Sequence, residues 1–192
     1  MNRFDAVLFD LDGTLLYTLA DIAAAVNGAL REMHRPERTV TEIRSMVGNG
    51  AKMLITRALG PGQEALIDDT LAVYARLYAA HAQEHVTPYA GIPELLDALK
   101  AEGIQTAVFS NKADPLCGKI IAHYFGTGRF ELVRGSRPNV PTKPDPTGVY
   151  ALMQDLGAEA ASTLFVGDSD VDILTGHNAG LPAMGALWGF RG

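Results

Sequence analysis

The sequence has little cysteine and no long apolar run. Its single cysteine, Cys117, cannot form a disulfide within the chain, which fits a reducing compartment. No window approaches the roughly 18 uninterrupted apolar residues of a membrane-spanning helix. The first apolar stretch runs directly into acidic residues, so no signal peptide is expected. We therefore expect a cytoplasmic protein that does not act at a membrane.

A surplus of basic residues is also absent. The chain has 16 lysines and arginines against 22 aspartates and glutamates, a net charge of −6. That balance argues against a nucleic-acid or anionic-membrane partner, although it leaves room for a local basic pocket. At 192 residues the chain fits one domain, or one domain that carries a smaller insertion. The sequence says nothing that separates a monomer from a homodimer.

The first 88 residues combine one predicted strand with a helical segment. Residues 4–9 form a short apolar run typical of a buried strand. From Thr18 the apolar residues follow three- and four-residue steps, which predicts a helix to about His34. Three further helices are expected in this segment, at 40–46, 50–59 and 63–85.

After Pro88, predicted strands alternate with predicted helices, a pattern that indicates an α/β fold with a doubly wound parallel sheet. The helical segment interrupts this pattern after its first strand. We therefore expect a core domain of residues 1–15 and 89–192, with residues 16–88 as an inserted helical cap. The expected strands of the second part are 104–110, 129–135, 162–168 and 181–187, and the helices between them are 93–103, 113–125, 144–157 and 170–180.

Two carboxylates, Asp10 and Asp12, follow the first strand in the stretch FDLDGT. Aspartate and glycine are common in turns, so an isolated D-x-D-G is about as often a turn as a site. Ligands of open α/β sheets, however, bind outside the carboxyl ends of the strands. Polar residues also follow the later strands, and this agreement favours a functional site: Ser110, Asn111 and Lys112; Lys143; and Asp168 and Asp172.

These residues suit phosphoryl transfer. Asp10 and Asp168 are expected to hold Mg²⁺, a cation that prefers oxygen ligands. Asp10 can attack phosphorus, and Asp12 can protonate the leaving alcohol and then deprotonate water. Lys143 and Ser110, with main-chain N–H groups near Gly13, would stabilise the phosphoryl charge. Asp172 would orient Lys143 or a metal-bound water.

Over nearly its whole length the chain resembles the haloacid dehalogenase superfamily of phosphohydrolases, and within it the phosphoglycolate-phosphatase-like group. The D-x-D-G-T motif of the family matches Asp10 to Thr14, and its G-D-S-x-x-D motif matches Gly167 to Asp172. Ser110 and Lys143 match the two weaker motifs. The resemblance implies a Rossmann-like core, a nucleophilic Asp10, and an Asp12 that adds a main-chain carbonyl to the Mg²⁺ ligands. Gly13, Thr14 and Asn111 are further expected phosphate or substrate contacts.

The chain departs from the group at three places. Tyr17 stands where members usually carry Asp, which puts the closure of the cap in doubt. The sequence stops at LWGFRG, where relatives usually continue, as either a trimmed form or a short variant. Residues 134–142 form a long polar connection before Lys143, whose effect on that lysine is open.

The predicted cap contains one candidate substrate loop, Gly48 to Lys52. Glycine and asparagine here can mark a plain turn. Main-chain N–H groups at a helix start can also bind an anion. Under the second interpretation, Gly50 and Lys52 would bind the substrate's far end.

The resulting prediction is a Mg²⁺-dependent phosphatase for a small phosphorylated metabolite, with phosphoglycolate first among candidates. A dehalogenase is disfavoured because it needs neither Asp12 nor Asp168. A phosphosugar mutase, a pyrophosphatase or a nucleotidase on the same core remains an alternative, as does a non-catalytic binding module.

Overall fold

The computed structural model describes residues 4–191 and has a parallel five-stranded sheet at its centre. The strand order is β5-β4-β1-β6-β7, and every neighbouring pair is parallel. The predicted α/β fold is thereby confirmed. The strands are β1 (Ala6–Phe9), β4 (Gln105–Ala113), β5 (Leu132–Ser136), β6 (Thr163–Gly167) and β7 (Ala183–Gly185).

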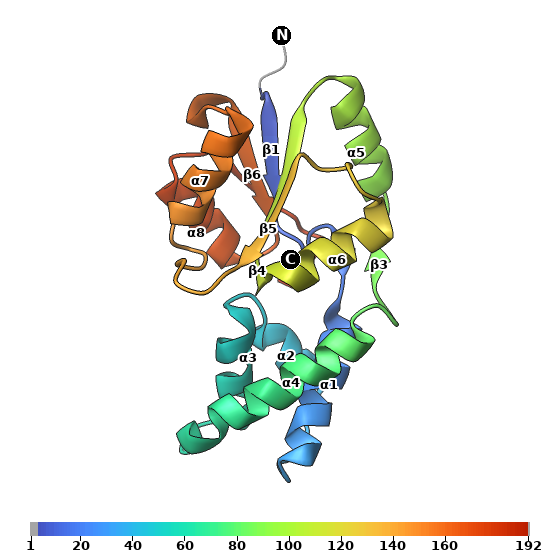
Figure 1. The fold of residues 1–192 in the computed structure, drawn as a ribbon, viewed down its shortest axis with the longest axis vertical. Helices are drawn as coiled ribbons and strands as arrows, with labels where there is room; N and C mark the ends of the chain where they lie inside the picture. Colours follow the sequence, from blue (N-terminus) through green and yellow to red (C-terminus); the bar gives the residue numbers. More distant parts are fainter. Residues whose placement is uncertain (1–3, 192) are drawn as a thin grey trace.

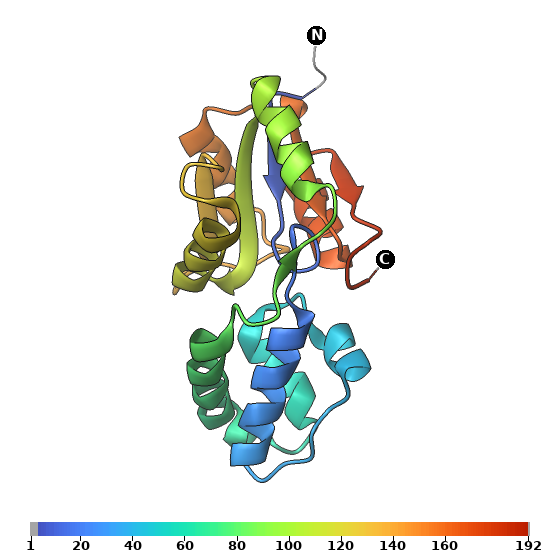
Figure 2. The same ribbon diagram turned by 90° about the vertical axis from the view of Figure 1, so that its right-hand side faces the viewer.

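Helices cover both faces of the sheet (Figures 1 and 2). On one face lie α5 (Ile92–Ala101) and α6 (Asp114–Phe125), and on the other α7 (Thr147–Leu156) and α8 (Asp170–Asn178), which follows a short 3₁₀ turn, η2 (Ala160–Ser162), and β6. Strand β1 is buried on both faces, because Val7 and Phe9 pack into one apolar cluster and Leu8 into the other. This explains why its sequence is a continuous apolar run rather than an alternation.

A separate bundle of four helices lies beyond the carboxyl ends of the strands (Figure 1). Its helix α2 begins with a capping box in which Thr39 and Glu42 satisfy each other's main-chain N–H groups. The bundle consists of α1 (Leu19–Glu32), α2 (Val40–Met46), α3 (Gly50–Leu59) and α4 (Ile67–His81), with a 3₁₀ turn, η1 (Glu64–Leu66), before α4.

The chain crosses between sheet and bundle through two short strands that the sequence did not predict. Strands β2 (Leu16–Tyr17) and β3 (Thr87–Pro88) pair in antiparallel fashion. No strand was expected within residues 16–88, and the helix expected at 63–85 is shorter in the structure, where α4 spans Ile67–His81. Two-residue strands carry no periodicity that could reveal them.

Strand β4 is longer than the predicted 104–110 segment. Its pairing with β5 is regular up to Phe109, opposite Arg134, and resumes only at Ala113, opposite Ser136. Four steps on β4 thus match two on β5, which is a bulge that redirects side chains at the strand end. The bulge contains Ser110, Asn111 and Lys112, three of the polar residues that the sequence placed at the strand ends.

Within residues 4–191, no helix combines the length and apolar character needed to cross a membrane.

Candidate active site

A cavity of about 260 Å³ lies between the carboxyl ends of the strands and the helical bundle. From the sheet side, the end of β4 and the segments that follow β1, β5 and β6 contribute to it. Most of the residues that the sequence predicted line this cavity: Asp10, Asp12, Gly50, Ser110, Asn111, Lys143, Asp168 and Asp172.

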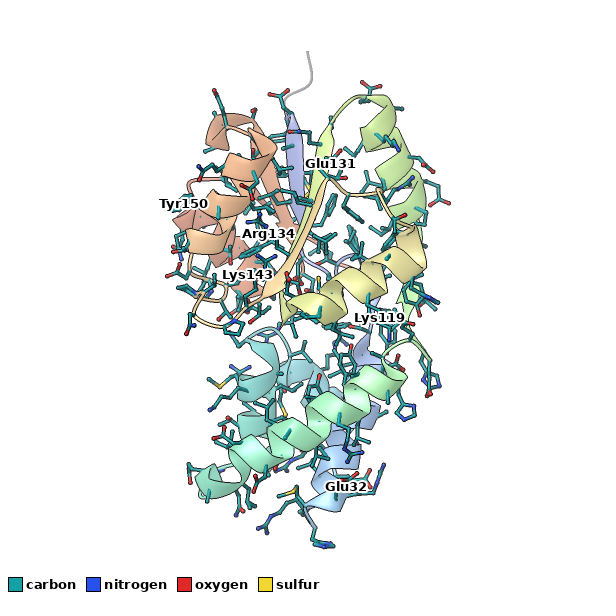
Figure 3. All side chains as sticks on the ribbon, viewed as in Figure 1. Glu32, Lys119, Glu131, Arg134, Lys143 and Tyr150 are labelled. Carbon is teal, nitrogen blue, oxygen red and sulfur yellow. The ribbon has the colours of Figure 1, made fainter. Side chains whose placement is uncertain are left out.

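At the base of the cavity, one lysine joins two carboxylates. The Lys143 ammonium donates to Asp10 Oδ1 at 2.6 Å and to Asp172 Oδ1 at 2.6 Å. Figure 3 shows Lys143 toward the end of the sheet that faces the bundle. Burial lowers the pKa of Lys143, but the two carboxylates outweigh this effect and raise it above its ordinary value. The lysine therefore stays charged.

Asn111 fixes the main chain at Lys143. Its side-chain oxygen accepts from the Lys143 N–H at 2.8 Å, and its Nδ2 donates to the Lys143 carbonyl at 3.1 Å. Nδ2 also donates to the carbonyl of Gly48, in the loop before α3, at 3.0 Å. The lysine that follows the polar connection 134–142 is thus held by Asn111, a residue outside that connection. This explains how Lys143 is positioned after a long polar segment.

Asp168 packs against a glycine that no other residue could replace. Gly13 has φ +88°, and a Cβ there would lie 2.3 Å from Asp168 Oδ2. The same oxygen accepts from the main-chain N–H of Phe190 at 2.6 Å. Gly13 therefore acts by leaving room for Asp168, and it is not among the residues that line the cavity.

The acidic residues at the base can hold a metal ion. Asp10, Asp168 and Asp172 each offer a carboxylate oxygen, and these oxygens lie within 4.8 Å of one another. Three carboxylates beside one ammonium, that of Lys143, leave two negative charges uncompensated, which matches a divalent cation. Burial raises the pKa of Asp10, although Lys143 opposes the change, and burial raises the pKa of Asp168 to about 6. A bound cation would keep both groups ionised.

Asp12 has two partners, Lys112 and Thr18, neither of which has a role that the sequence predicts. Lys112 donates to Asp12 Oδ1 at 2.7 Å and to Oδ2 at 2.8 Å, and its side chain is almost fully buried. The Thr18 hydroxyl donates to Oδ1 at 2.6 Å. The Lys112 ammonium also lies 4.7 Å from the ring centre of Tyr78 on α4. The S-N-K stretch at the end of β4 was the signal available for Lys112, but the partners of Lys112 come from distant parts of the chain.

The remaining predicted phosphate contacts differ in their placement. Ser110 is buried and lines the cavity, and its hydroxyl oxygen accepts from the Lys112 N–H at 3.3 Å. Thr14 is fully buried outside the cavity lining, and its hydroxyl has no hydrogen-bond partner among residues 4–191. A direct contact of Thr14 with substrate thus stays a prediction.

The structure separates the two predicted substrate contacts of the bundle. Gly50 lines the cavity. A Cβ placed on this glycine would lie 3.6 Å from the Asn111 carbonyl oxygen. Lys52 is exposed and donates to Asp68, which is exposed as well, at 2.9 Å. It is not among the residues that line the cavity.

Residues near the end of the chain return to the site, although no local sequence signal predicts this. The Trp188 indole donates to the Thr14 carbonyl at 3.0 Å, and Arg191 lines the cavity. Tyr17 makes an edge-on contact with Phe190, with 6.1 Å between ring centres. Tyr17 thus forms an aromatic contact where the chain enters the bundle.

Comparison with known proteins decides the family. The family model described as haloacid dehalogenase-like hydrolase matches residues 7–186. The chain belongs to this family. It is 35% identical to a phosphoglycolate phosphatase of Aquifex aeolicus, covering 96% of this chain and 85% of the relative, and 34% identical to one of Pseudomonas putida, covering 96% and 70%.

Solved structures agree with this assignment. A protein described as a predicted phosphoglycolate phosphatase from Haemophilus somnus matches with a TM-score of 0.92 and 30% identity, over 98% of this chain and 88% of that chain. A predicted phosphatase from Clostridium acetobutylicum, with a TM-score of 0.88, 24% identity and coverage of 98% and 87%, shows the same fold. The family and its relatives together indicate that the protein is a phosphatase.

Proposed function

We propose that this haloacid dehalogenase-like phosphatase hydrolyses a small phosphorylated metabolite with Mg²⁺ through a phosphorylated Asp10. The observation that carries the proposal is the meeting of Asp10, Lys143 and Asp168 in one cavity at the strand ends, with Asp10 and Lys143 buried and Asp168 partly buried. It combines a carboxylate nucleophile, a fixed ammonium for phosphoryl oxygens and a second carboxylate for a cation.

The reaction has two displacements at phosphorus. An Asp10 oxygen forms a bond to phosphorus, the bond to the alcohol oxygen breaks, and Asp12 supplies the proton of the departing alcohol. Asp12 then takes a proton from water, the water oxygen attacks phosphorus, and inorganic phosphate leaves Asp10. Lys143 and the Ser110 hydroxyl stabilise charge on the phosphoryl oxygens throughout.

Mg²⁺ would be held by the carboxylates of Asp10 and Asp168 and by the main-chain carbonyl of Asp12. When bound, it would neutralise charge on the phosphate and on the two carboxylates. Asp172 acts on Lys143, because their 2.6 Å hydrogen bond fixes the direction of the ammonium.

The names of the curated relatives make phosphoglycolate the first substrate to assay. A cytoplasmic location, a division into a core of residues 1–15 and 89–192 with a cap of residues 16–88, and a monomeric or homodimeric state belong to the same proposal. The two chain crossings at β2 and β3 support the division.

Phosphate release from phosphoglycolate and from ethyl phosphate, with Mg²⁺ and with chelator, tests the function. The Asp10→Asn variant should lose on the order of 10³-fold or more in kcat while its Tm shows a folded protein. Asp5→Asn, at the exposed start of the same strand region, is the matched control and should keep wild-type activity. Retention of about a tenth of the activity by Asp10→Asn, or full activity in chelator, would overturn the assignment.

A further inference from the structure

The side of the cavity formed by the bundle is apolar. Residues of α3 and α4 make up this surface, and on α4 they are spaced by one, three and four positions, so that they share one helical face. In Figure 1 these two helices lie beneath the ends of the strands. We call this surface the apolar wall, and it consists of Ala51, Leu54, Tyr74, Ala75, Tyr78 and Ala79.

The cations around the cavity are already paired. Three of them, within residues 4–191, line it: Lys143, Lys112 and Arg191. Lys143 binds Asp10 and Asp172, and Lys112 binds both oxygens of Asp12.

The third cation, Arg191, donates to Asp170 at 2.9 Å and to the Val47 carbonyl at 2.6 Å. Lys52, the cation expected on this side, lies outside the cavity. On the α4 side of the cavity, a substrate carboxylate would therefore face apolar atoms and would lose its hydration without gaining an ion pair.

Two aromatic rings give the apolar wall its shape. Tyr74 and Tyr78 stack with 5.5 Å between ring centres and an angle of 10° between their planes. The Tyr78 hydroxyl is buried and has no hydrogen-bond partner among residues 4–191. Burial raises the pKa of Tyr78 well above its ordinary value, so the hydroxyl keeps its proton as a donor.

We infer that the apolar wall binds the alcohol portion of the substrate, and that the enzyme prefers phosphate monoesters of aromatic alcohols to esters whose alcohol portion carries a carboxylate. This inference rests on the phosphatase function proposed above. The phosphate meets Lys143 and the carboxylates at the strand ends, while the ring lies against α3 and α4. The stacked tyrosines favour a flat, apolar group.

Three esters of primary alcohols test the preference: 2-phenylethyl phosphate, ethyl phosphate and phosphoglycolate. Because the departing oxygen is of similar chemistry in all three, differences in kcat/KM report binding of the alcohol portion. We expect 2-phenylethyl phosphate to exceed both others by about tenfold or more. Equal or higher kcat/KM for phosphoglycolate would overturn the inference.

A matched pair of variants on α4 tests the apolar wall itself. Ala79 lines the cavity and Ala80 does not, and both are exposed, so that neither substitution disturbs the core. Ala79→Lys should lower the ratio of kcat/KM for 2-phenylethyl phosphate over phosphoglycolate by about tenfold or more, since it places an ammonium on the wall. Ala80→Lys adds the same charge and should leave the ratio unchanged.

The outcomes separate the inference from the function on which it rests. Mg²⁺-dependent hydrolysis of ethyl phosphate or phosphoglycolate without preference for the aromatic ester overturns the inference and leaves the phosphatase function standing. An equal change of the ratio in Ala79→Lys and Ala80→Lys also overturns the inference. No Mg²⁺-dependent hydrolysis of any of the three removes the phosphatase function itself.

Discussion

At the scale of the residue, Asp172 serves the helix and the site with one side chain. Its Oδ2 accepts from the Ser169 N–H at 3.0 Å and from the Ser169 hydroxyl at 2.6 Å, which closes a capping box at the start of α8. Its Oδ1 accepts from the Lys143 ammonium. Because the helix cap holds the carboxylate, the direction of Lys143 depends on the first turn of α8.

Lys112 is the residue whose role the structure adds. Lys112→Met keeps the length of the side chain but removes both hydrogen bonds to Asp12, so we expect Asp12 to lose its fixed direction. Turnover should fall by about tenfold or more on an alkyl phosphate, and less on an aryl phosphate, whose departing oxygen needs little protonation. Steady-state kinetics with both esters measures this difference.

Lys119→Met is the matched control for this prediction. Lys119 is exposed on α6, where Figure 3 labels it, and it is not among the residues that line the cavity. The activity of the Lys119→Met variant should equal that of the wild type on both esters. Equal losses on alkyl and aryl phosphates in Lys112→Met would show that Lys112 does not act through Asp12.

At the scale of the element, the bulge of β4 joins the sheet, the bundle and the loop before α7. Asn111→Ala removes the hydrogen bonds to Gly48 and Lys143 and leaves the buried main chain of Lys143 without partners. We expect a loss of about 1–3 kcal/mol in the free energy of unfolding. We also expect a lower kcat, which chemical denaturation and kinetics would measure together.

Asn178→Ala provides the comparison for Asn111→Ala. Asn178 is exposed and donates a single hydrogen bond, at 2.9 Å, to the carbonyl of Pro144, the residue after Lys143. Its loss should change stability and kcat little. A wild-type kcat in Asn111→Ala would mean that the bulge does not position Lys143.

Elements with strong periodicity were predicted well from the sequence. The helices expected at 40–46 and 50–59 have these bounds in the structure. Strand ends were predicted less well: β4 continues through Asn111 and Lys112 to Ala113, since polar side chains there point into a site rather than into solvent. The sequence pattern cannot distinguish these two environments.

The candidate site was likewise predicted in part, with some residues placed correctly and others not. Carboxylates that follow parallel strands meet at one edge of the sheet, so Asp10 and Asp168 could be placed together from their positions after predicted strands. Lys52 was grouped with Gly50 because they are close in sequence. On a helix, however, Gly50, Ala51 and Leu54 share the face toward the cavity while Lys52 points away from it. The pairing of Lys112 with Asp12 depends on tertiary contacts and had no local signal.

At the scale of the whole molecule, the ionised carboxylates of the site lower the free energy of unfolding unless a cation is bound. Burial raises the pKa of Asp168 from 3.8 to about 6, so the folded chain binds this proton more tightly than the unfolded chain. Without metal, the contribution of Asp168 to stability is therefore lost as the pH rises from about 4 through about 6. A divalent cation should restore it where Asp168 is ionised.

The rise in Tm on adding Mg²⁺ should accordingly be larger at about pH 7.5 than at about pH 5, where protons compete for the carboxylates. Thermal unfolding with Mg²⁺ and with chelator at both pH values measures this. Asp168→Asn should remove most of the Mg²⁺ effect at both. A rise that is equal at the two pH values, or larger at the lower one, would contradict the metal assignment of Asp168.

The central claim is that Asp10 carries the phosphoryl group during turnover. The most direct measurement is the mass of the Asp12→Asn variant after acid quench during reaction with an aryl phosphate and Mg²⁺. Because Asp12 activates the water of the second displacement, this variant should accumulate protein that is heavier by one phosphoryl group, and peptide mapping should place the group on Asp10. Product formation without phosphorylated protein, or a phosphoryl group on any other residue, would contradict the account.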